Sequence, residues 1–282
     1  MIPTEFGSFT NADGLTIHTV KWLPQDDIRA VVVLVHGIGE HSGRYDHVAH
    51  RLNQAGYAVY ALDHRGHGRS EGLRLHFDNF DQPVSDLEQF VTYVHTDQSD
   101  QPMFMYGHSM GAIISLRYVL KHQAALAGWI SSGTPLLLDE ETATPVVVAA
   151  SFMARLLPKL RILPLDVTDL SRDPEVVAAY RADPYTNHKR IRLQIINAMV
   201  KASQEARAQL HTIRLPVLIL HGTDDKAAPI AGSRYLYEHI SSPDKTLKLY
   251  EGLYHEIHNE PEQERVLNDL VTWLDRQQQG DA

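Results

Sequence analysis

The chain has 282 residues, a formal charge of −9 and no cysteine, which excludes a disulfide framework, a thiolate nucleophile and a cysteine-ligated metal site. Apolar residues make up 43% and charged residues 22%, as in an ordinary globular protein, and the acidic balance argues against a nucleic-acid partner or a polybasic membrane clamp. One count is unusual, since there are 17 histidines, each a candidate base, metal ligand or structural residue.

The chain opens with a predicted hairpin. Residues 5–9 and 15–20 form two strand-like runs around Asn11-Ala12-Asp13-Gly14. An Asp-Gly pair between two such runs is typical of a tight turn between antiparallel strands. We therefore expect an antiparallel hairpin at the edge of a sheet.

Apolar runs then alternate with helical patterns along the chain. The runs cover residues 30–35, 57–62, 103–106, 129–132, 217–220 and 247–250, and the helical patterns cover residues 46–55, 84–95, 110–122, 233–240 and 261–277. Buried strands that alternate with helices indicate βαβ units. We predict one α/β domain over residues 1–282, with a mostly parallel central sheet and flanking helices.

The alternation stops between about residues 136 and 210. Prolines recur there, and no strand-like run appears before residue 217. We expect this segment to form a helical cap inserted over the sheet. Within it, residues 145–157 predict a helix that is apolar on nearly all sides, which either packs inside the protein or faces substrate or lipid.

We expect neither a signal peptide nor a membrane-spanning segment. Residues 1–14 have neither the basic nor the apolar region of a signal peptide. The uncharged apolar run over residues 142–154 is shorter than the about 20 residues that span a bilayer. We expect a cytoplasmic protein without a transmembrane helix, and we consider peripheral membrane contact through the cap.

A Gly-x-Ser-x-Gly sequence carries the strongest chemical signal. Gly107-His108-Ser109-Met110-Gly111 follows a predicted strand and precedes a predicted helix, which is the context of a nucleophile elbow. The turn would present the Ser109 hydroxyl at a helix N-terminus, where backbone N–H groups favour developing negative charge. Ser109 is the predicted nucleophile.

An oxyanion hole needs two backbone donors beside such a serine. The residue after the nucleophile, Met110, supplies one, and the loop after an earlier strand supplies the other. That loop is His36-Gly37-Ile38-Gly39, and its glycines allow close approach of the backbone to a substrate. We predict the Ile38 and Met110 amides as the two donors.

A serine hydroxyl needs a histidine base oriented by a carboxylate. In this fold class the acid follows a strand after the serine, and the histidine follows the last strand. Gly222-Thr223-Asp224-Asp225 and Tyr254-His255-Glu256-Ile257-His258 stand in these places. Spacing alone leaves Asp224 or Asp225 as the acid and His255 or His258 as the base.

Five motifs in this order resemble the monoacylglycerol lipase family of the α/β-hydrolase superfamily, a group also labelled lysophospholipase. They lie at residues 36–45, 63–70, 107–111, 222–225 and 250–255, and the resemblance covers nearly the whole chain outside the cap. The family's Gly-x-x-Asp motif implies Asp225 as the acid, and its Gly-x-Tyr-His motif implies His255 as the base. The resemblance also implies that the cap lines an apolar acyl tunnel.

The resulting expectation is a cofactor-free serine hydrolase that cleaves a monoacylglycerol, a small lipid ester, to fatty acid and glycerol. Lysophospholipid hydrolysis and general carboxylester hydrolysis are alternatives within the same chemistry. A non-catalytic binding protein on the same scaffold is a third, remote alternative. The sequence makes no prediction of the oligomeric state.

The other histidines have a structural interpretation. His36, Gly37 and His108 flank the predicted site, and we expect them to position its loops. His47 and His50, like His64 and His67, are three residues apart and could share a metal ion, but no matching set of further ligands accompanies them. We therefore expect no metal.

Overall fold

The computed structural model describes residues 4–136, 160–163, 166–187 and 190–279, and its centre is an eight-stranded sheet. The strand order is β1-β2-β4-β3-β5-β6-β9-β10, in which β1–β2 and β2–β4 are antiparallel and the other pairs are parallel. The strands are β1 Thr4–Thr10, β2 Thr16–Trp22, β3 Ala30–Val35, β4 Tyr57–Leu62, β5 Met103–His108, β6 Gly128–Ser132, β9 Val217–Gly222 and β10 Lys245–Tyr250. The predicted α/β class, parallel sheet and antiparallel edge hairpin are confirmed.

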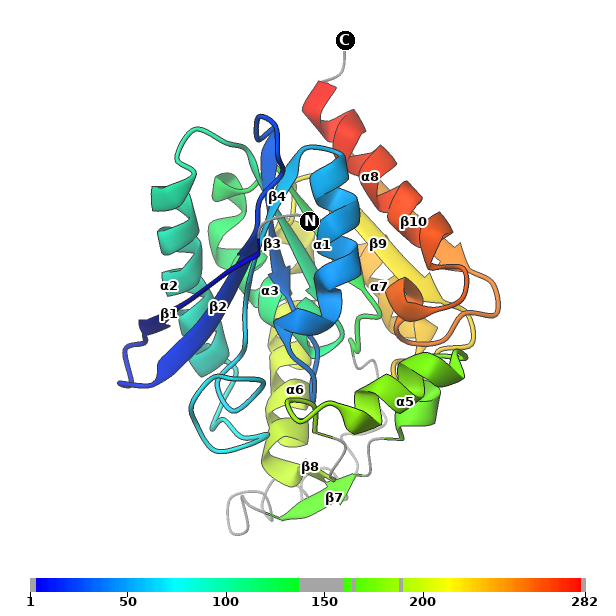
Figure 1. The fold of residues 1–282 in the computed structure, drawn as a ribbon. Coiled ribbons are helices and arrows are strands. Elements are labelled where there is room, and N and C mark those ends of the chain that lie inside the picture. The colour runs from blue at the N-terminus through cyan, green and yellow to red at the C-terminus, as the bar shows by residue number, and fades with distance from the viewer. Residues whose placement is uncertain (1–3, 137–159, 164–165, 188–189, 280–282) are drawn as a thin grey trace.

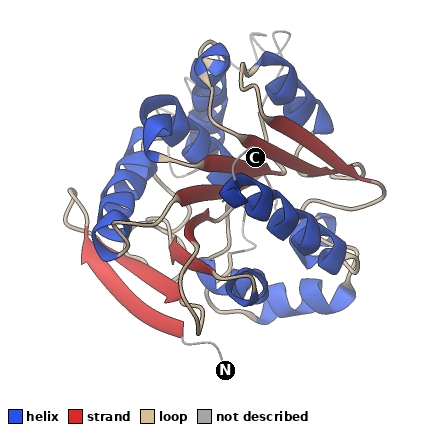
Figure 2. Ribbon diagram, turned by 90° about the horizontal axis from the view of Figure 1, so that it is seen from above, coloured by secondary structure: helices blue, strands red, loops and turns tan. Residues whose placement is uncertain are grey.

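Helices cover both faces of the sheet (Figures 1 and 2). They are α1 Asp46–Gln54, α2 Asp81–Asp97, α3 Met110–His122, α5 Pro174–Ala182, α6 Leu193–Arg207, α7 Ile230–His239 and α8 Gln263–Gln279. Alternate residues of β3 point to opposite faces, so Val31 and Val33 pack with α2 and α3, whereas Val32 and Leu34 pack with α1 and α8. This double burial explains why β3 is apolar at every position.

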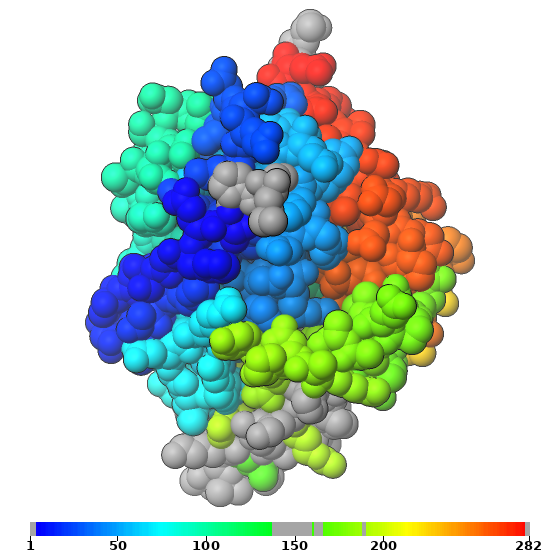
Figure 3. Space-filling view, in the orientation of Figure 1, coloured from blue at the N-terminus to red at the C-terminus, as the bar shows by residue number. Residues whose placement is uncertain are grey.

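The carboxyl ends of the parallel strands carry the predicted functional loops. Ser109 directly follows β5, Asp225 follows β9 and His255 follows β10. Ligands of open α/β sheets bind at this end of the strands. The described part of residues 160–207 lies across the same end, where Figure 3 shows α5 and its neighbours in green along the molecule's lower side.

One detail of the predicted cap was wrong. The sequence indicated no strand between residues 136 and 210, but β7 (Arg161–Leu163) and β8 (Ile191–Arg192) form a separate two-stranded antiparallel sheet. Segments of three and two residues are too short to show a strand periodicity, and their pairing depends on a contact about thirty residues apart in the chain. The apolar helix expected at residues 145–157 lies outside the described residues.

Candidate active site

Ser109 occupies a strained turn between β5 and α3. Its backbone has φ 54° and ψ −122°, a conformation that costs a non-glycine residue free energy and occurs mainly at functional sites. The Ser109 amide donates to the Ser132 carbonyl at 2.9 Å, and the Ser109 carbonyl accepts from the Ala112 amide at 2.9 Å. These bonds hold the strained turn in place at the N-terminus of α3.

The two flanking glycines are required by crowding. A Cβ at Gly111 would overlap the carbonyl oxygens of Val35 and His36, and a Cβ at Gly107 would overlap Ser115 Oγ and approach the Gly111 carbonyl oxygen at 2.7 Å. Backbone atoms cannot move aside as a flexible side chain can. The glycines therefore let α3 pack against the end of β3 directly behind Ser109, as the Gly-x-Ser-x-Gly pattern predicts.

The structure pairs His255 with Asp225. His255 Nδ1 lies 2.7 Å from Asp225 Oδ2, and both side chains are almost fully buried. The second oxygen, Asp225 Oδ1, accepts from the Ala227 and Ala228 amides, each at 2.8 Å. Because an ionised carboxylate can only accept, His255 Nδ1 carries the proton and Nε2 is left as the basic nitrogen.

Asp224 and His258, the alternative acid and base, do not form such a pair. Asp224 is exposed and contacts the Thr223 hydroxyl at 3.2 Å. His258 is buried, stacks on Tyr45 with ring centroids 4.8 Å apart, and neither of its ring nitrogens has a hydrogen-bond partner among the described residues. Burial lowers its pKa to about 3. The geometry of an acid–base pair is met by Asp225 and His255.

Burial and neighbouring charged groups shift the pKa values of Asp225 and His255. Burial opposes charge on both groups, yet the two histidines beside Asp225, His255 and His221, hold the pKa of its carboxyl well below the usual range. Burial alone lowers the pKa of His255, but the Asp225 charge and hydrogen bond outweigh it and raise that pKa above 6.5. The pair therefore favours a carboxylate that stabilises an imidazolium.

Sequence reasoning missed His221. Its Nε2 lies 3.1 Å from Asp225 Oδ2 and 3.0 Å from the Ala228 carbonyl oxygen, and its Nδ1 lies 2.7 Å from Ser233 Oγ. Its position at the end of β9, four residues before Asp225, is the only signal in the sequence. His221 is thus a second buried imidazole beside the carboxylate.

The loop after β3 lies against Ser109. A Cβ at Gly37 would stand 3.2 Å from Ser109 Cβ and 3.4 Å from His108 Cδ2, so a side chain there would crowd the serine. Ile38 lines the same cavity as Ser109, and its amide has no hydrogen-bond acceptor among the described residues. Met110 begins α3 at the adjacent turn. This arrangement leaves Ile38 and Met110 as the proposed oxyanion donors.

The two histidines predicted to position these loops are buried beside them. His36 Nδ1 donates to the Gly37 carbonyl at 2.8 Å while its Nε2 accepts from the His64 amide at 2.9 Å. His108 lies with its ring centroid 4.8 Å from that of His255. Burial lowers the pKa of both rings well below 6.5, so they contact the site as neutral groups.

A buried ion network supports the loop after β3, residues 36–39, which we call the oxyanion loop. Sequence reasoning missed this network too. Arg44 donates to both oxygens of Glu256 at 2.6 and 2.7 Å and to Glu40 at 2.8 Å. Glu40 also accepts from the Gly37 amide at 2.6 Å. The network therefore ties the Gly37 turn to the segment that follows His255, across more than two hundred residues of chain.

A cavity of about 500 Å³ opens over Ser109 and His255. Most of its remaining wall is apolar: Ile38 comes from the loop after β3, Pro135 precedes the cap, and Leu170, Ile191, Ile196 and Met199 come from the described part of the cap. Asp166, Asp169 and Lys226 add charge to the lining. Ser109 and His255 thus face one cavity, although no hydrogen bond joins their side chains within the described structure. Such bonds are often long in unliganded enzymes.

Among the described residues, no group of three or more His, Asp or Glu side chains is placed to hold a metal ion. None of the described helices is long and apolar enough to cross a membrane.

The chain is similar to known hydrolases along nearly its whole length. Residues 26–262 match the family model described as serine aminopeptidase, S33. The chain is 41% identical over 268 residues to the monoacylglycerol lipase of Mycolicibacterium smegmatis, with 95% of each chain covered. It is 35% identical to the monoglyceride lipase of Rattus norvegicus, covering 94% of this chain and 88% of the relative. A soluble variant of monoglyceride lipase from Saccharomyces cerevisiae, solved in complex with a substrate analogue, superimposes with a TM-score of 0.86 at 28% identity, over 98% of this chain and 96% of that one.

Proposed function

The chain belongs to the serine aminopeptidase S33 family of α/β-hydrolases, and from this premise we propose that it is a serine ester hydrolase that cleaves monoacylglycerols to a fatty acid and glycerol. The observation that carries the proposal is the Asp225–His255 pair beside Ser109 in a largely apolar cavity. The monoacylglycerol and monoglyceride lipases that cover almost the whole chain support the same substrate class.

The proposed mechanism uses only side chains and amides of this chain. Ser109 Oγ attacks the ester carbonyl while His255 Nε2 takes its proton, and Asp225 stabilises the resulting imidazolium. The Ile38 and Met110 amides donate to the oxyanion. His255 then gives the proton to the departing glycerol oxygen, and the acyl group stays on Ser109.

Deacylation repeats these steps with water. His255 removes a proton from the water as it attacks the acyl-enzyme carbonyl, and the proton returns to Ser109 Oγ when the fatty acid leaves. The apolar part of the cavity, from Ile38 to Met199, is of the kind that takes an acyl chain out of water. That burial supplies the binding free energy that orients the ester.

A substrate panel on wild-type and Ser109→Ala protein tests the proposal. Wild-type protein should hydrolyse a long-chain monoacylglycerol faster than the matching lysophospholipid, a short soluble ester or an aminoacyl anilide. The Ser109→Ala variant should lose all activity and all labelling by a fluorophosphonate probe. Faster hydrolysis of the lysophospholipid or of the anilide would show that monoacylglycerols are not the preferred substrate class. Wild-type protein that does not react with the probe would indicate a non-catalytic binding protein.

Peripheral contact with a membrane through the cap is part of the same proposal. A monoacylglycerol is itself sparingly soluble, and Leu160 and Tyr185 of the cap are large exposed hydrophobic residues. We expect the wild-type protein to cosediment weakly with phosphatidylcholine vesicles. A protein that remains in the supernatant at all lipid concentrations would contradict this part.

A further inference from the structure

The cap donates two hydrogen bonds to the oxyanion loop. The Tyr180 hydroxyl, on α5, donates to the Gly39 carbonyl at 2.7 Å, and the Asn187 amide donates to the same oxygen at 2.7 Å. A carbonyl oxygen has two lone pairs, so these bonds use its full capacity. Gly39 directly follows Ile38, whose amide is a proposed oxyanion donor. The described part of the cap therefore contacts the backbone beside that donor.

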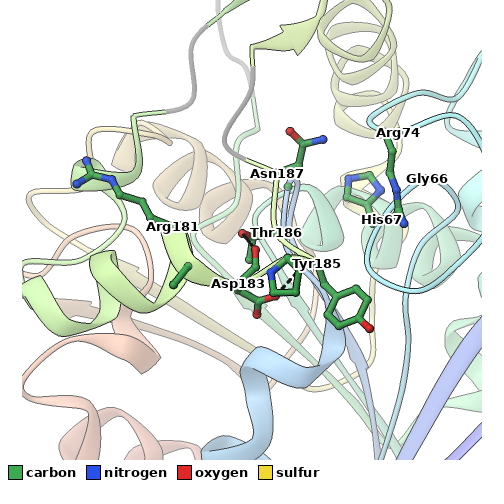
Figure 4. A pocket seen from close by; sticks show the side chains of 11 residues that line it. Gly66, His67, Arg74, Arg181, Asp183, Tyr185, Thr186 and Asn187 are labelled. Atoms are coloured by element: carbon green, nitrogen blue, oxygen red, sulfur yellow. Dashed lines mark hydrogen bonds between the residues drawn. The ribbon is translucent and has the colours of Figure 1, made fainter.

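A second contact joins the same two segments. His41 Nε2 lies 2.8 Å from Asp183 Oδ2, and His41 Nδ1 accepts from the Gly43 amide at 3.1 Å, so Nε2 carries the proton and donates to the carboxylate. Figure 4 shows Asp183 and Asn187 on one short stretch of chain after α5, in the wall of a cavity that Gly39 also lines. This stretch is therefore fixed to the chain around the oxyanion loop at two points.

Tyr180 is itself held in place. Its side chain is buried, the Arg44 guanidinium lies over its ring at 4.6 Å, and its own carbonyl accepts from the Thr186 hydroxyl at 2.6 Å. Arg44 also donates to Glu40, so the ring contacts the same cation that supports the oxyanion loop. A buried ring with a bonded hydroxyl has a defined orientation.

The oxyanion loop needs such contacts because its own backbone is permissive. Gly39 has a φ of 77°, in the left-handed region, and glycine adopts many conformations at little cost. On the other side of Ile38, His36 Nδ1 donates to the Gly37 carbonyl at 2.8 Å. That carbonyl and the Ile38 amide belong to one planar trans peptide group, so a fixed oxygen also fixes the direction of the N–H. The Ile38 amide thus lies between two held carbonyls, one of which depends on Tyr180.

The same part of the cap is bonded to the loop that carries the base. The Glu256 amide donates to the Leu170 carbonyl at 2.8 Å, and the Ser171 hydroxyl donates to the Asn259 carbonyl at 2.9 Å. The described residues within 166–187 therefore connect the loop of the base with the oxyanion loop. This connection gives the cap a function in addition to lining the cavity.

We propose that Tyr180 is a positioning residue for the oxyanion hole. Its hydroxyl fixes the Gly39 carbonyl, so the Ile38 amide is directed toward the ester oxygen before the substrate binds. Donors held in place before the reaction stabilise the developing charge without reorganisation. The inference rests on the proposed ester hydrolysis at Ser109, and it predicts that Tyr180 affects every ester alike, whatever its acyl chain.

Tyr180→Phe tests the proposal, since it keeps the ring over Arg44 and removes only the hydroxyl. We expect kcat to fall at least about fivefold with KM little changed. This loss is smaller than the about 10²–10³-fold that follows removal of an oxyanion donor, because Asn187 still donates to Gly39. The factor should be the same for a long-chain monoacylglycerol and for a short soluble ester.

Tyr57→Phe is the matched control. Tyr57 begins β4, at the opposite end of the parallel strands from Ser109, and its hydroxyl donates to Asp275 at 2.7 Å. This variant should keep the wild-type kcat, and thermal unfolding should show that both variants are folded. Equal losses of kcat in the two variants would overturn the proposal. So would a loss in Tyr180→Phe that is confined to KM or to the long-chain substrate, because Tyr180 would then act on the substrate.

The rate of labelling by a fluorophosphonate probe is a second measurement that does not depend on the substrate class, because the phosphoryl oxygen takes the place of the oxyanion. This rate should fall in Tyr180→Phe by a factor similar to that of kcat. If the variant labels as fast as an active wild type, Tyr180 has no positioning role and the proposed hydrolase still stands. Wild-type protein that neither labels nor hydrolyses any ester would instead refute the proposed function, and this inference with it.

Discussion

His221 Nε2 lies 3.1 Å from Asp225 Oδ2, the same oxygen that accepts the Nδ1–H of His255. With two backbone amides on its other oxygen, the Asp225 carboxylate is held from several sides in a buried place. A carboxylate so surrounded by donors stays ionised and cannot rotate freely. This fixes the position of the His255 ring.

Removing the charge of Asp225 should nearly abolish activity. Asp225→Asn keeps the size of the side chain but favours the wrong tautomer of His255, and we expect kcat to fall by about 10⁴-fold. Asp224→Asn is the control, since Asp224 is exposed and does not contact His255. Steady-state kinetics on one monoacylglycerol would contradict the assignment if both variants lost activity equally.

Activity should rise with pH through a midpoint above 6.5. The Asp225 charge raises the pKa of His255, and only the neutral imidazole can take the Ser109 proton, so activity is lost as pH falls through that raised pKa. The check is kcat/KM for a soluble ester against pH, together with NMR titration of the His255 ring in Ser109→Ala protein.

The Asp225→Asn change should lower the His255 midpoint in the same NMR titration, because the imidazolium loses its partner. A midpoint that stays in place or moves upward would show that Asp225 does not set the charge of His255. His221→Phe should lower the His255 midpoint less than Asp225→Asn does, since it leaves the Asp225 charge in place and removes only a neighbouring imidazole.

The buried ion network should matter more for stability than an exposed pair. Arg44→Met would leave Glu40 and Glu256 buried without their cation, and we expect the free energy of unfolding to fall by about 3–5 kcal/mol. Arg276→Met breaks the exposed pair with Asp244 and should cost less than about 1 kcal/mol. Urea unfolding of both variants makes the comparison, and similar losses would contradict the role given to Arg44.

Filling the apolar cavity should shorten the preferred acyl chain. Ile196 lines the cavity from α6, so Ile196→Trp should lower kcat/KM for a long-chain monoacylglycerol at least about tenfold while sparing a short soluble ester. Lys201→Trp adds the same ring at an exposed position of α6 and is the control. If the two substrates lose activity in the same proportion, the acyl chain does not lie along Ile196.

The sequence by itself determined the sheet, the edge hairpin and the turn that presents Ser109. These features depend on local patterns: β-branched runs such as residues 30–35, an Asp-Gly turn, and two glycines at fixed distances from a serine. Gly111 shows the limit of that local reasoning. The pattern demands a glycine there, but only the structure shows that the carbonyl oxygens of Val35 and His36 are the atoms in contact.

Tertiary structure decided everything that depends on which side chains face one another. Asp224 and Asp225 are neighbours in sequence, yet only Asp225 is buried against His255. The Arg44–Glu256 pair joins residues 212 positions apart, and the Tyr180 hydroxyl donates to a carbonyl 141 positions away. Burial and long-range pairing depend on the folded chain as a whole, so residue spacing predicts the type of chemistry but not the partners.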